Sequence, residues 1–321
     1  MAAKRPLVVA VDLGGTQIRV ALSDLEGNFV RRDNCPTEAS QGQEAVLRRL
    51  AARIQEVRQG FSDTDILGVG IGSPGPVDAL AGLIISPPNL PGWEEVPLRD
   101  LLEQRTSLPV RLANDANAAA LGEWAFGKGR GRQNVVYVTI STGIGGGVIL
   151  GGRVLEGAHG MAGEFGHMIV RAGGPACNLG HPGCLEGLAS GTAVARRAAE
   201  SVAAGIATTI PEHVAPGSVL DARAVAAAAA AGDGVARAIL QDAGEALGLG
   251  IASLINAFDP SRVVVGGGLS RAWSLLRPSL ESALTTVVMS PDHRQIDVVT
   301  AALGDDAGLV GAAVHAFAEI R

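Results

Sequence analysis

The sequence contains very little lysine, only Lys4 and Lys128, and its formal net charge is −6. A protein that binds nucleic acid nonspecifically needs a basic face to neutralise phosphates, so we do not expect a nucleic-acid partner. If this protein binds a phosphate group, then backbone amides, arginine or a metal ion must hold most of its charge.

Cysteine is also scarce, and we find no sign of a targeting segment. The three cysteines Cys35, Cys177 and Cys184 are too few and too widely spread for a disulfide framework. Asp12 interrupts the N-terminal apolar run before it reaches the length of a signal-peptide core. No apolar run approaches the ~20 residues that a membrane span needs. We therefore expect a soluble, cytoplasmic protein without a membrane partner.

Hydrophobic residues, in contrast, make up 47% of the chain, which is ample for a buried core. At roughly 100–200 residues per domain, this length predicts two domains. Strand-like and helix-like segments alternate, so the expected fold class is α/β. The expected strands are 6–13, 17–23, 28–31, 66–71, 110–112, 134–140, 148–150 and 262–265. The expected helices are 43–58, 116–124 and 190–204, further helices up to about 257, and a C-terminal helix at 306–320.

Two glycine-rich turns, Gly14-Gly15-Thr16 and Ser141–Gly147, each connect two expected strands. Successive backbone N–H groups in such a turn form a concave anion site, and a Cβ atom would block the close approach of a phosphate. Ordinary hairpin turns are the alternative, since Gly-Gly pairs are common in them. The repetition, with a threonine in both turns (Thr16 and Thr142), favours phosphate binding and an internal duplication.

These turns differ from the common nucleotide-binding motifs. A dinucleotide fingerprint or a Walker A loop opens a helix, whereas both turns lead into a strand. The segments Asp12–Arg19 and Ser141–Gly147 resemble the two phosphate motifs of the actin/hexokinase-like ATPases, and Val265–Gly268 resembles their adenosine motif. More narrowly, the chain resembles the ROK (repressor, open reading frame, kinase) family of bacterial sugar kinases, and the glucokinases within it, from about residue 7 to about residue 316.

The resemblance implies a fold of two ribonuclease-H-like domains with a central cleft. Residues 1–112 would form the N-terminal domain, to which the helix at 306–321 returns, and residues 113–305 would form the C-terminal domain. The implied cofactors are ATP and Mg²⁺, with Asp12 holding the metal through water. The implied contacts to the terminal phosphates are Gly14, Gly15, Thr16, Thr142, Gly143 and Gly145, and those to the adenosine are Gly266, Gly267 and Gly268.

The candidate catalytic residue is Asp115, which stands with Asn114 between an expected strand and an expected helix. Asn and Asp are preferred at helix N-caps, so a purely structural role is an equal alternative from the local sequence. A carboxylate here could instead take the proton of a sugar hydroxyl as the O–P bond forms. In the family, the matching Asn–Asp pair binds the sugar, and its Asp is the general base. The other sugar contacts that the resemblance implies are Gly75, Asn89, Glu164, His167 and Glu186.

The activity implied is ATP-dependent phosphorylation of a hexose, with glucose as the first expectation. Fructose, N-acetylmannosamine and N-acetylglucosamine are alternative substrates. Two other classes of function are a sugar-responsive regulator and an actin-like scaffold. ROK regulators carry a helix-turn-helix domain, for which the eleven residues before Asp12 leave no room, and a scaffold would not need Asp115. The family also implies a homodimer or homotetramer, and we expect a dimer; the apolar stretch Leu247–Ile255 could serve its interface or, as we favour, the core.

A structural Zn²⁺ is the last expectation, and it depends on the loop between Gly163 and Cys184. In ROK kinases the matching loop reads Cys-x-Cys-Gly-x-x-Gly-Cys, and an upstream histidine completes the zinc site. This chain has Leu179 at the second cysteine position, and leucine cannot bind zinc. A loop without a metal, or a Cys177–Cys184 disulfide, is therefore an alternative. The expected ligands are His167, Cys177, Cys184 and, in place of the missing cysteine, His181, with His159 as a second candidate.

Overall fold

The structure is a computed structural model and describes residues 6–318. By its internal contacts the chain divides into two compact units. Unit 1 consists of Met1–Gln133, Gly147–Gly163 and Ala302–Arg321, and unit 2 consists of Asn134–Gly146 and Glu164–Ala301.

Unit 1 is built on a five-stranded sheet with the order β3-β2-β1-β4-β7. The first three strands form an antiparallel meander, and β1, β4 and β7 run parallel to one another. The strands are β1 (Leu7–Leu13), β2 (Gln17–Asp24), β3 (Phe29–Pro36), β4 (Ile66–Ser73) and β7 (Val110–Asn114). Three short strands also belong to unit 1: β5 (Val77–Asp78), β6 (Leu83–Ile84) and β10 (Arg153–Val154).

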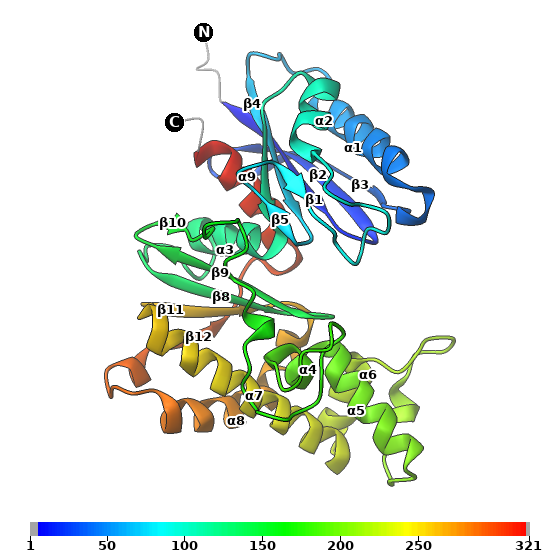
Figure 1. Cartoon of the computed structure of the whole chain (residues 1–321), viewed down its shortest axis with the longest axis vertical. Coiled ribbons are helices and arrows are strands. Elements are labelled where there is room, and N and C mark those ends of the chain that lie inside the picture. The colour runs from blue at the N-terminus through cyan, green and yellow to red at the C-terminus, as the bar shows by residue number, and fades with distance from the viewer. Residues whose placement is uncertain (1–5, 319–321) are drawn as a thin grey trace. The chain divides into compact units, whose positions relative to one another are not determined.

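Helices cover both faces of this sheet, because its central strands are apolar on both sides (Figure 1). Successive side chains of a strand point to opposite faces. Thus Val9 and Val11 of β1 join the core under α1 (Gln43–Arg58) and α2 (Leu98–Thr106), while Val8 and Ala10 join a second core with α9 (Ala307–Ala318).

The helix α3 (Asp115–Phe126) packs against α9 in unit 1. The two helices approach closely because Gly311 has no side chain; a Cβ atom there would lie 1.5 Å from the carbonyl oxygen of Ala118. The buried Glu123 of α3 also accepts hydrogen bonds from the amides of Ala302 and Leu303, at 2.8 and 2.6 Å. These contacts place α3 with the first sheet, whereas the expected boundary at residue 112 would assign it to the second domain.

Unit 2 contains most of a second five-stranded sheet, with the order β10-β9-β8-β11-β12. Its strands are β8 (Val135–Ile140), β9 (Ile144–Leu150), β11 (Arg262–Gly266) and β12 (Asp297–Thr300), and the border between the units runs through β9. Numbered from its own first strand, each sheet has the order 3-2-1-4-5, in agreement with the duplication that the two glycine turns indicate. The second turn is shorter than expected, because β9 already begins at Ile144.

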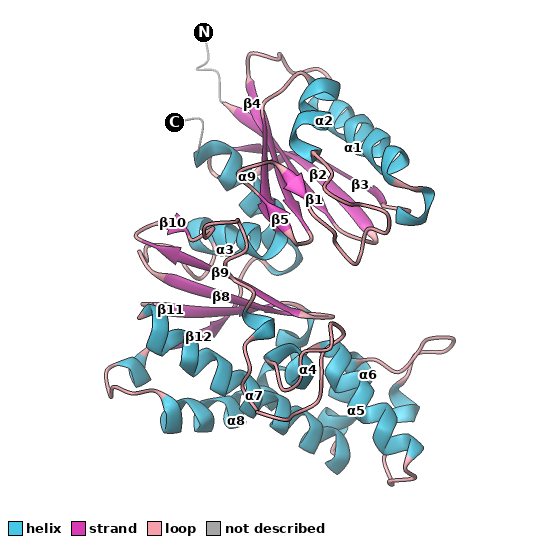
Figure 2. Ribbon diagram, viewed as in Figure 1, coloured by secondary structure: helices cyan, strands magenta, loops and turns pink. Residues whose placement is uncertain are grey.

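The helices of unit 2 gather on one side of its sheet (Figure 2). They are α4 (Leu185–Ala189), α5 (Gly191–Ala203), α6 (Ala222–Ala231), α7 (Gly234–Phe258) and α8 (Trp273–Val287). By length and composition alone, α7 could cross a membrane, which the sequence analysis overlooked. However, 67% of its apolar window is buried, and it packs against α8, α6, α5 and α4, as is typical of a core helix.

Candidate functional site

Several of the expected site residues lie at the carboxyl ends of the parallel strands β1, β4 and β7. Asp12 pairs in register with Gly72, and Ser73 pairs with Asn114. Parallel strands end at the same edge of a sheet, and in open α/β sheets ligands bind at this edge. Asp12, the first glycine turn, the start of the Gly75 loop and Asp115 therefore share one edge of the first sheet.

The first glycine turn contacts the loop that carries Asn89. A Cβ atom on Gly15 would lie 2.7 Å from the Cβ atom of Asn89 and 2.8 Å from its carbonyl oxygen, so only glycine fits there. Thr16 and Asn89 are exposed, whereas Gly15 and Gly75 are half-buried. The turn is closed by a 2.9 Å hydrogen bond from the amide of Gly14 to the carbonyl oxygen of Gln17. Unit 1 thus brings an expected phosphate turn and an expected sugar contact side by side.

Asp12 is buried and pairs with Arg19, the residue opposite it on β2. Burial raises the pKa of Asp12, and the adjacent Arg19 guanidinium opposes that rise. Arg19 also donates to the carbonyl oxygen of Asp305. This pairing was not expected from the sequence, although a hairpin centred on residues 15 and 16 places residues 12 and 19 opposite each other. A buried carboxylate beside a glycine turn is suited to hold a metal ion through a water molecule. The Arg19 guanidinium would add a second positive charge beside that ion.

Asn114 and Asp115 lie at the junction of β7 and α3. Asn114 is the N-cap of α3: its side chain accepts from the amides of Ala116 and Asn117, at 2.9 and 3.4 Å. Asp115 is the first helical residue, and its carboxylate is exposed while it accepts from the amide of Ala116 at 2.7 Å. An exposed carboxylate has the accessibility that a general base needs.

In unit 2, the second glycine turn and the segment Gly266–Gly268 are neighbours at the end of β8 and β11. Gly266 pairs in register with Thr139, and the amide of Gly268 donates to the Ser141 hydroxyl at 3.4 Å. A Cβ atom on Gly267 would lie 2.3 Å from the carbonyl oxygen of Ile140, whereas nothing lies within 4 Å of one on Gly268. Gly268 is exposed. The strand ends are therefore packed tightly, whereas the space beside Gly268 is open.

Glu186 of α4 holds the second glycine turn directly. Its carboxylate oxygen Oε2 accepts from the amide of Ile144 at 3.0 Å, and a Cβ atom on Gly143 would lie 2.4 Å from the same oxygen. The first residues of α5 support the turn as well, since Thr192 donates to the carbonyl oxygen of Thr142 at 2.8 Å. Glu164 is exposed and His167 half-buried at the short 3-10 turn Phe165–His167. An expected sugar contact therefore also supports an expected phosphate turn, which the sequence did not indicate.

The histidines and cysteines of the 163–184 loop come together. The Nδ1 atom of His167 lies 3.9 Å from the Cys177 Sγ atom and 3.3 Å from the His181 Nδ1 atom. Side-chain ligand atoms of His167, Cys177 and His181 lie within 4.8 Å of one another, and this group does not include Cys184. Neighbouring ligand atoms around a tetrahedral zinc are about 3.3–3.8 Å apart, so the two distances from the His167 Nδ1 atom are close to those of a zinc site. Both cysteines are free thiols, and the side chain of Leu179 points outward with 62% exposure.

The expected site residues divide between the two units. Unit 1 holds Asp12, Gly14, Gly15, Thr16, Gly75, Asn89, Asn114 and Asp115, and unit 2 holds Thr142, Gly143, Gly145, Glu164, His167, Cys177, His181, Cys184, Glu186 and Gly266–Gly268. His159, the second candidate for the fourth zinc ligand, belongs to unit 1. A hollow of about 650 Å³ at the C-terminal ends of α1 and α2 contains none of these residues.

Comparison with known proteins identifies the family. Residues 8–319 match the ROK family. The chain is 39% identical to a glucokinase of Thermotoga maritima over 306 residues, which cover 95% of this chain and 96% of that protein. It is also 30% identical to a xylose repressor of Caldicellulosiruptor bescii, over 95% of this chain and 76% of that protein.

Two solved structures are similar over nearly the whole chain. A ROK hexokinase from Thermus thermophilus is 38% identical with a TM-score of 0.81, and the match covers 98% of this chain and 99% of that one. A ROK glucokinase from Streptomyces griseus, in complex with glucose and AMPPNP, is 36% identical with a TM-score of 0.79, over 96% and 98% of the two chains. The chain belongs to the ROK family and has the ROK sugar kinase fold of the actin/hexokinase-like ATPases.

Proposed function

We propose that this protein transfers the terminal phosphoryl group of ATP to glucose, forming glucose 6-phosphate. The observation that carries the proposal is the edge of the first sheet, where the first glycine turn, Asn89 and Asp115 occur together. The identity of 36–39% to proteins named glucokinase, over about 95% of the chain, supports the same activity. A related ROK glucokinase has been solved with glucose and AMPPNP.

In this proposal Asp115 is the general base, and Asn114 binds the sugar beside it. The further sugar contacts are Gly75, Asn89, Glu164, His167 and Glu186. Phosphoryl transfer depends mostly on positioning and on neutralising charge, and glycine-turn amides can do both without lysine. Gly14 to Thr16 and Thr142 to Gly145 would contact the phosphates, and Gly266 to Gly268 the adenosine.

Mg²⁺ and Zn²⁺ complete the proposed site. Asp12 would hold Mg²⁺ through water, and the ion would supply positive charge to the phosphates. His167, Cys177, His181 and Cys184 would hold a structural Zn²⁺, and the gathering of the first three side chains supports this proposal. The zinc would fix the imidazole of His167 and the start of α4, which carries Glu186.

Three broader proposals follow from family membership. The repeated 3-2-1-4-5 strand order supports two ribonuclease-H-like domains. The resemblance puts 1–112 and 306–321 in one and 113–305 in the other, but the packing of α3 with α9 favours a boundary after α3. The last three residues of the 306–321 segment lie outside the described residues. The protein would be a homodimer, and it would act in the cytoplasm.

The deciding experiment is ADP formation at fixed ATP and Mg²⁺ across a panel of hexoses. The panel contains glucose, fructose, mannose, N-acetylmannosamine and N-acetylglucosamine. We expect the highest kcat/KM with glucose and loss of turnover when Mg²⁺ is omitted. No hexose-dependent ADP release with any of the sugars would refute the kinase proposal, and a preference for an N-acetylated sugar would refute glucose.

A sugar-responsive regulator is the second candidate, since the chain is similar to a xylose repressor over 76% of that protein's length. A regulator binds the sugar without consuming ATP. Calorimetry with glucose, combined with the ADP assay, separates the two candidates: glucose binding without turnover would favour the regulator.

A further inference from the structure

The loop from Glu164 to Cys184 contains no helix or strand beyond the short 3-10 turn at Phe165–His167. Backbone hydrogen bonds within the segment fold it back on itself. For example, the amide of Arg171 donates to the carbonyl oxygen of Gly183 at 3.1 Å, and the amide of Leu185 donates to the carbonyl oxygen of Met168 at 2.9 Å. These bonds shape the loop itself, whereas its position against the neighbouring helices depends on contacts with them. Those contacts matter here because the loop carries His167 and leads directly into Glu186.

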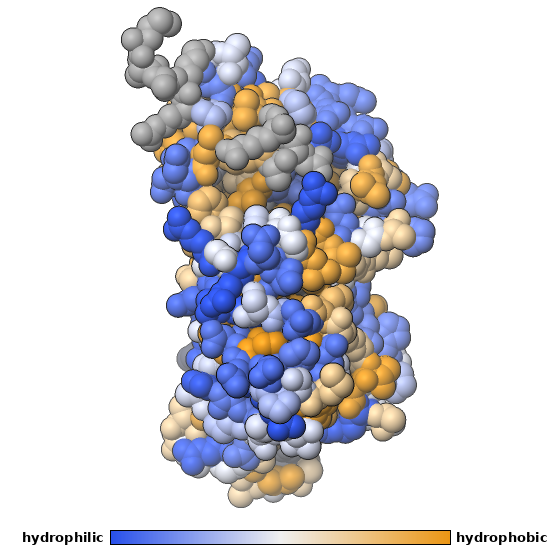
Figure 3. All heavy atoms as spheres, turned by 90° about the vertical axis from the view of Figure 1, so that its left-hand side faces the viewer, coloured by the Kyte–Doolittle hydropathy of each residue, from blue (hydrophilic) through white to orange (hydrophobic). Residues whose placement is uncertain are grey.

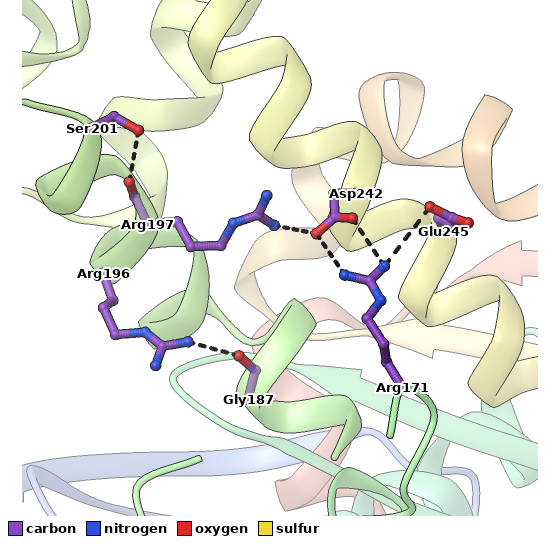
Figure 4. Close-up of polar contacts among 7 residues, drawn as sticks. All are labelled: Arg171, Gly187, Arg196, Arg197, Ser201, Asp242 and Glu245. Carbon is purple, nitrogen blue, oxygen red and sulfur yellow. Dashed lines mark hydrogen bonds and ion pairs between the residues drawn. The ribbon is translucent and has the colours of Figure 1, made fainter. Parts of the chain in front are cut away.

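The first attachment is an ion-pair cluster around Asp242 of α7, which we call the Asp242 clamp (Figure 4). Arg171 of the loop donates to both carboxylate oxygens, from Nη2 to Oδ1 at 2.9 Å and from Nη1 to Oδ2 at 3.4 Å. Arg197 of α5 donates to Oδ2 at 2.5 Å, and Glu245 lies 3.8 Å from Arg171. One carboxylate thus joins the loop to two different helices.

The second attachment comes from Arg196, the neighbour of Arg197 on α5 (Figure 4). Arg196 donates to the carbonyl oxygen of Gly187 in α4 at 2.9 Å and to that of Ala176 in the loop at 3.3 Å. Two adjacent arginines of one helix therefore hold the loop and the helix that follows it: the loop is held before Cys177, at Arg171 and Ala176, and α4 is held after it, at Gly187.

The charges show why Asp242 is the centre of the clamp. Burial raises the pKa of Asp242, but the hydrogen bond from Arg171 and the charges of Arg197 and Arg171 outweigh it, so the pKa lies below its usual value. The carboxylate therefore remains charged at neutral pH. Without the negative charge of Asp242, the neighbouring guanidinium groups of Arg171 and Arg197 would repel each other, which favours movement of the loop away from α5. Loss of either arginine alone leaves one ion pair intact.

We propose that Asp242 is a positioning residue for the hexose contacts: through Arg171 and Arg197 it fixes the loop that presents His167 and Glu186. This inference rests on the proposed hexose kinase function. Asp242 itself contacts neither sugar nor nucleotide in this proposal, and it acts by limiting the positions of the loop. Its loss should therefore raise the KM for glucose more than it lowers kcat, because the loop can still reach its binding position at an entropic cost.

The test compares Asp242→Asn, Asp242→Glu and the control Glu281→Gln. Glu281 forms an ion pair with Arg277 on the outer surface of α8, so the control removes one negative charge from unit 2 away from the loop. We expect Asp242→Asn to raise the KM for glucose about 3- to 10-fold, with kcat changed by less than about 2-fold. Amide hydrogen exchange should become faster in residues 164–186 and remain unchanged in the sheet strands. Asp242→Glu, which keeps the charge, should restore much of both properties, and Glu281→Gln should match the wild type.

Two results would overturn the proposal. One is a folded Asp242→Asn variant with wild-type KM for glucose, and the other is wild-type exchange in residues 164–186. Failure of the proposed function gives a different result, because the wild-type protein would then form no ADP with glucose. In that case the exchange measurement still decides whether Asp242 orders the loop.

Discussion

At the scale of single residues, Asp115 has the position of a base and also begins a helix. We predict that Asp115→Asn retains the fold and most of the glucose affinity but lowers kcat by about 10²–10⁴-fold, the usual effect of losing a general base. Steady-state kinetics and glucose calorimetry measure the two effects. Asp100→Asn is a matched control, since Asp100 also lies in the first turn of a helix in unit 1. Near wild-type turnover in Asp115→Asn would leave Asp115 with a purely structural role.

Glu186 supports the second glycine turn through the amide of Ile144, so its role extends beyond the sugar. We predict that Glu186→Gln raises the KM for both ATP and glucose, because an amide accepts a weaker hydrogen bond than a carboxylate does. Glu164→Gln should raise the KM for glucose alone, because the contacts described for Glu164 include none with the second glycine turn. Kinetics at varied ATP and varied glucose distinguish the two variants. An unchanged KM for ATP in Glu186→Gln would show that Glu186 contributes to glucose binding only.

Residue types and spacing predicted some groups of side chains, but they did not predict every contact. The His/Cys loop is local in sequence, and three of its expected ligands, His167, Cys177 and His181, lie together. The contacts of Glu186 with Ile144 and of Asp242 with Arg171 join residues 42 and 71 positions apart. Contacts of that range depend on how helices pack, which no local pattern reports.

At the scale of elements, α7 begins at a well-satisfied N-cap. The Asp233 carboxylate accepts from the Ala236 amide at 2.8 Å and from Thr208 and Thr209. These hydrogen bonds, of which the one from the Ala236 amide contributes most, lower the pKa of Asp233 to about 2 from the usual 3.8. Because the folded-state pKa is depressed, this stabilisation is complete above about pH 4. It is lost as the pH falls from 4 to 2.

We predict that Asp233→Ala lowers the free energy of unfolding at pH 7 by about 1–2 kcal/mol, the upper range for an N-cap. The difference between wild type and variant should shrink as the pH falls from 4 towards 2. Urea unfolding across this pH range measures it. Asp221→Ala is the matched control. Asp221 caps α6 through the amides of Arg223 and Ala224 and has a 3.8 Å ion pair with the exposed Arg223, whereas Asp233 also accepts from two threonine hydroxyls, so the loss of Asp221 should cost less. A difference that stays constant down to pH 2 would contradict the charged cap.

The His/Cys loop gives the second prediction for an element. We predict one zinc per chain in purified protein by elemental analysis, and reduced zinc content in His181→Ala, because three ligands hold zinc less tightly than four. His159→Ala is the control and should keep its zinc. Zinc well below one per chain, with full activity in chelator, would refute the metal site. Normal zinc content in His181→Ala would show that His181 is not a zinc ligand, without excluding the zinc site itself.

Some elements were missed for identifiable reasons. The helix α8 contains Pro278, which normally argues against a helix interior, but this proline lies in the second turn of the helix. The strand β12 is short, has only half-buried apolar residues, and lies at a sheet edge, so its pattern is weak. The helix α1, by contrast, has the expected bounds of 43–58, since its apolar residues recur at helical spacing.

At the scale of the whole molecule, the duplication was predictable because it rests on two similar glycine hairpins, and the shared 3-2-1-4-5 strand order agrees with it. The division into compact units was not predictable to the same extent. It depends on α3 packing with α9, which lie almost 200 residues apart in the chain. The face shown in Figure 3 has several apolar patches separated by hydrophilic residues.

The last prediction separates the two roles considered for the apolar stretch Leu247–Ile255. Leu247 and Ile251 are fully buried within unit 2, which supports a core role, so a dimer interface must use other residues. We predict that light scattering at micromolar concentration gives twice the chain mass of 32.5 kDa.

Leu247→Ala should lower the free energy of unfolding by about 2–5 kcal/mol, because it leaves a cavity, and it should not change the mass of the folded protein. As a control, Ser253→Ala replaces an exposed residue of the same helix and should change neither property. A mass near 32.5 kDa for the wild type would contradict the dimer, and a Leu247→Ala variant that dissociates while remaining folded would assign the stretch to the interface.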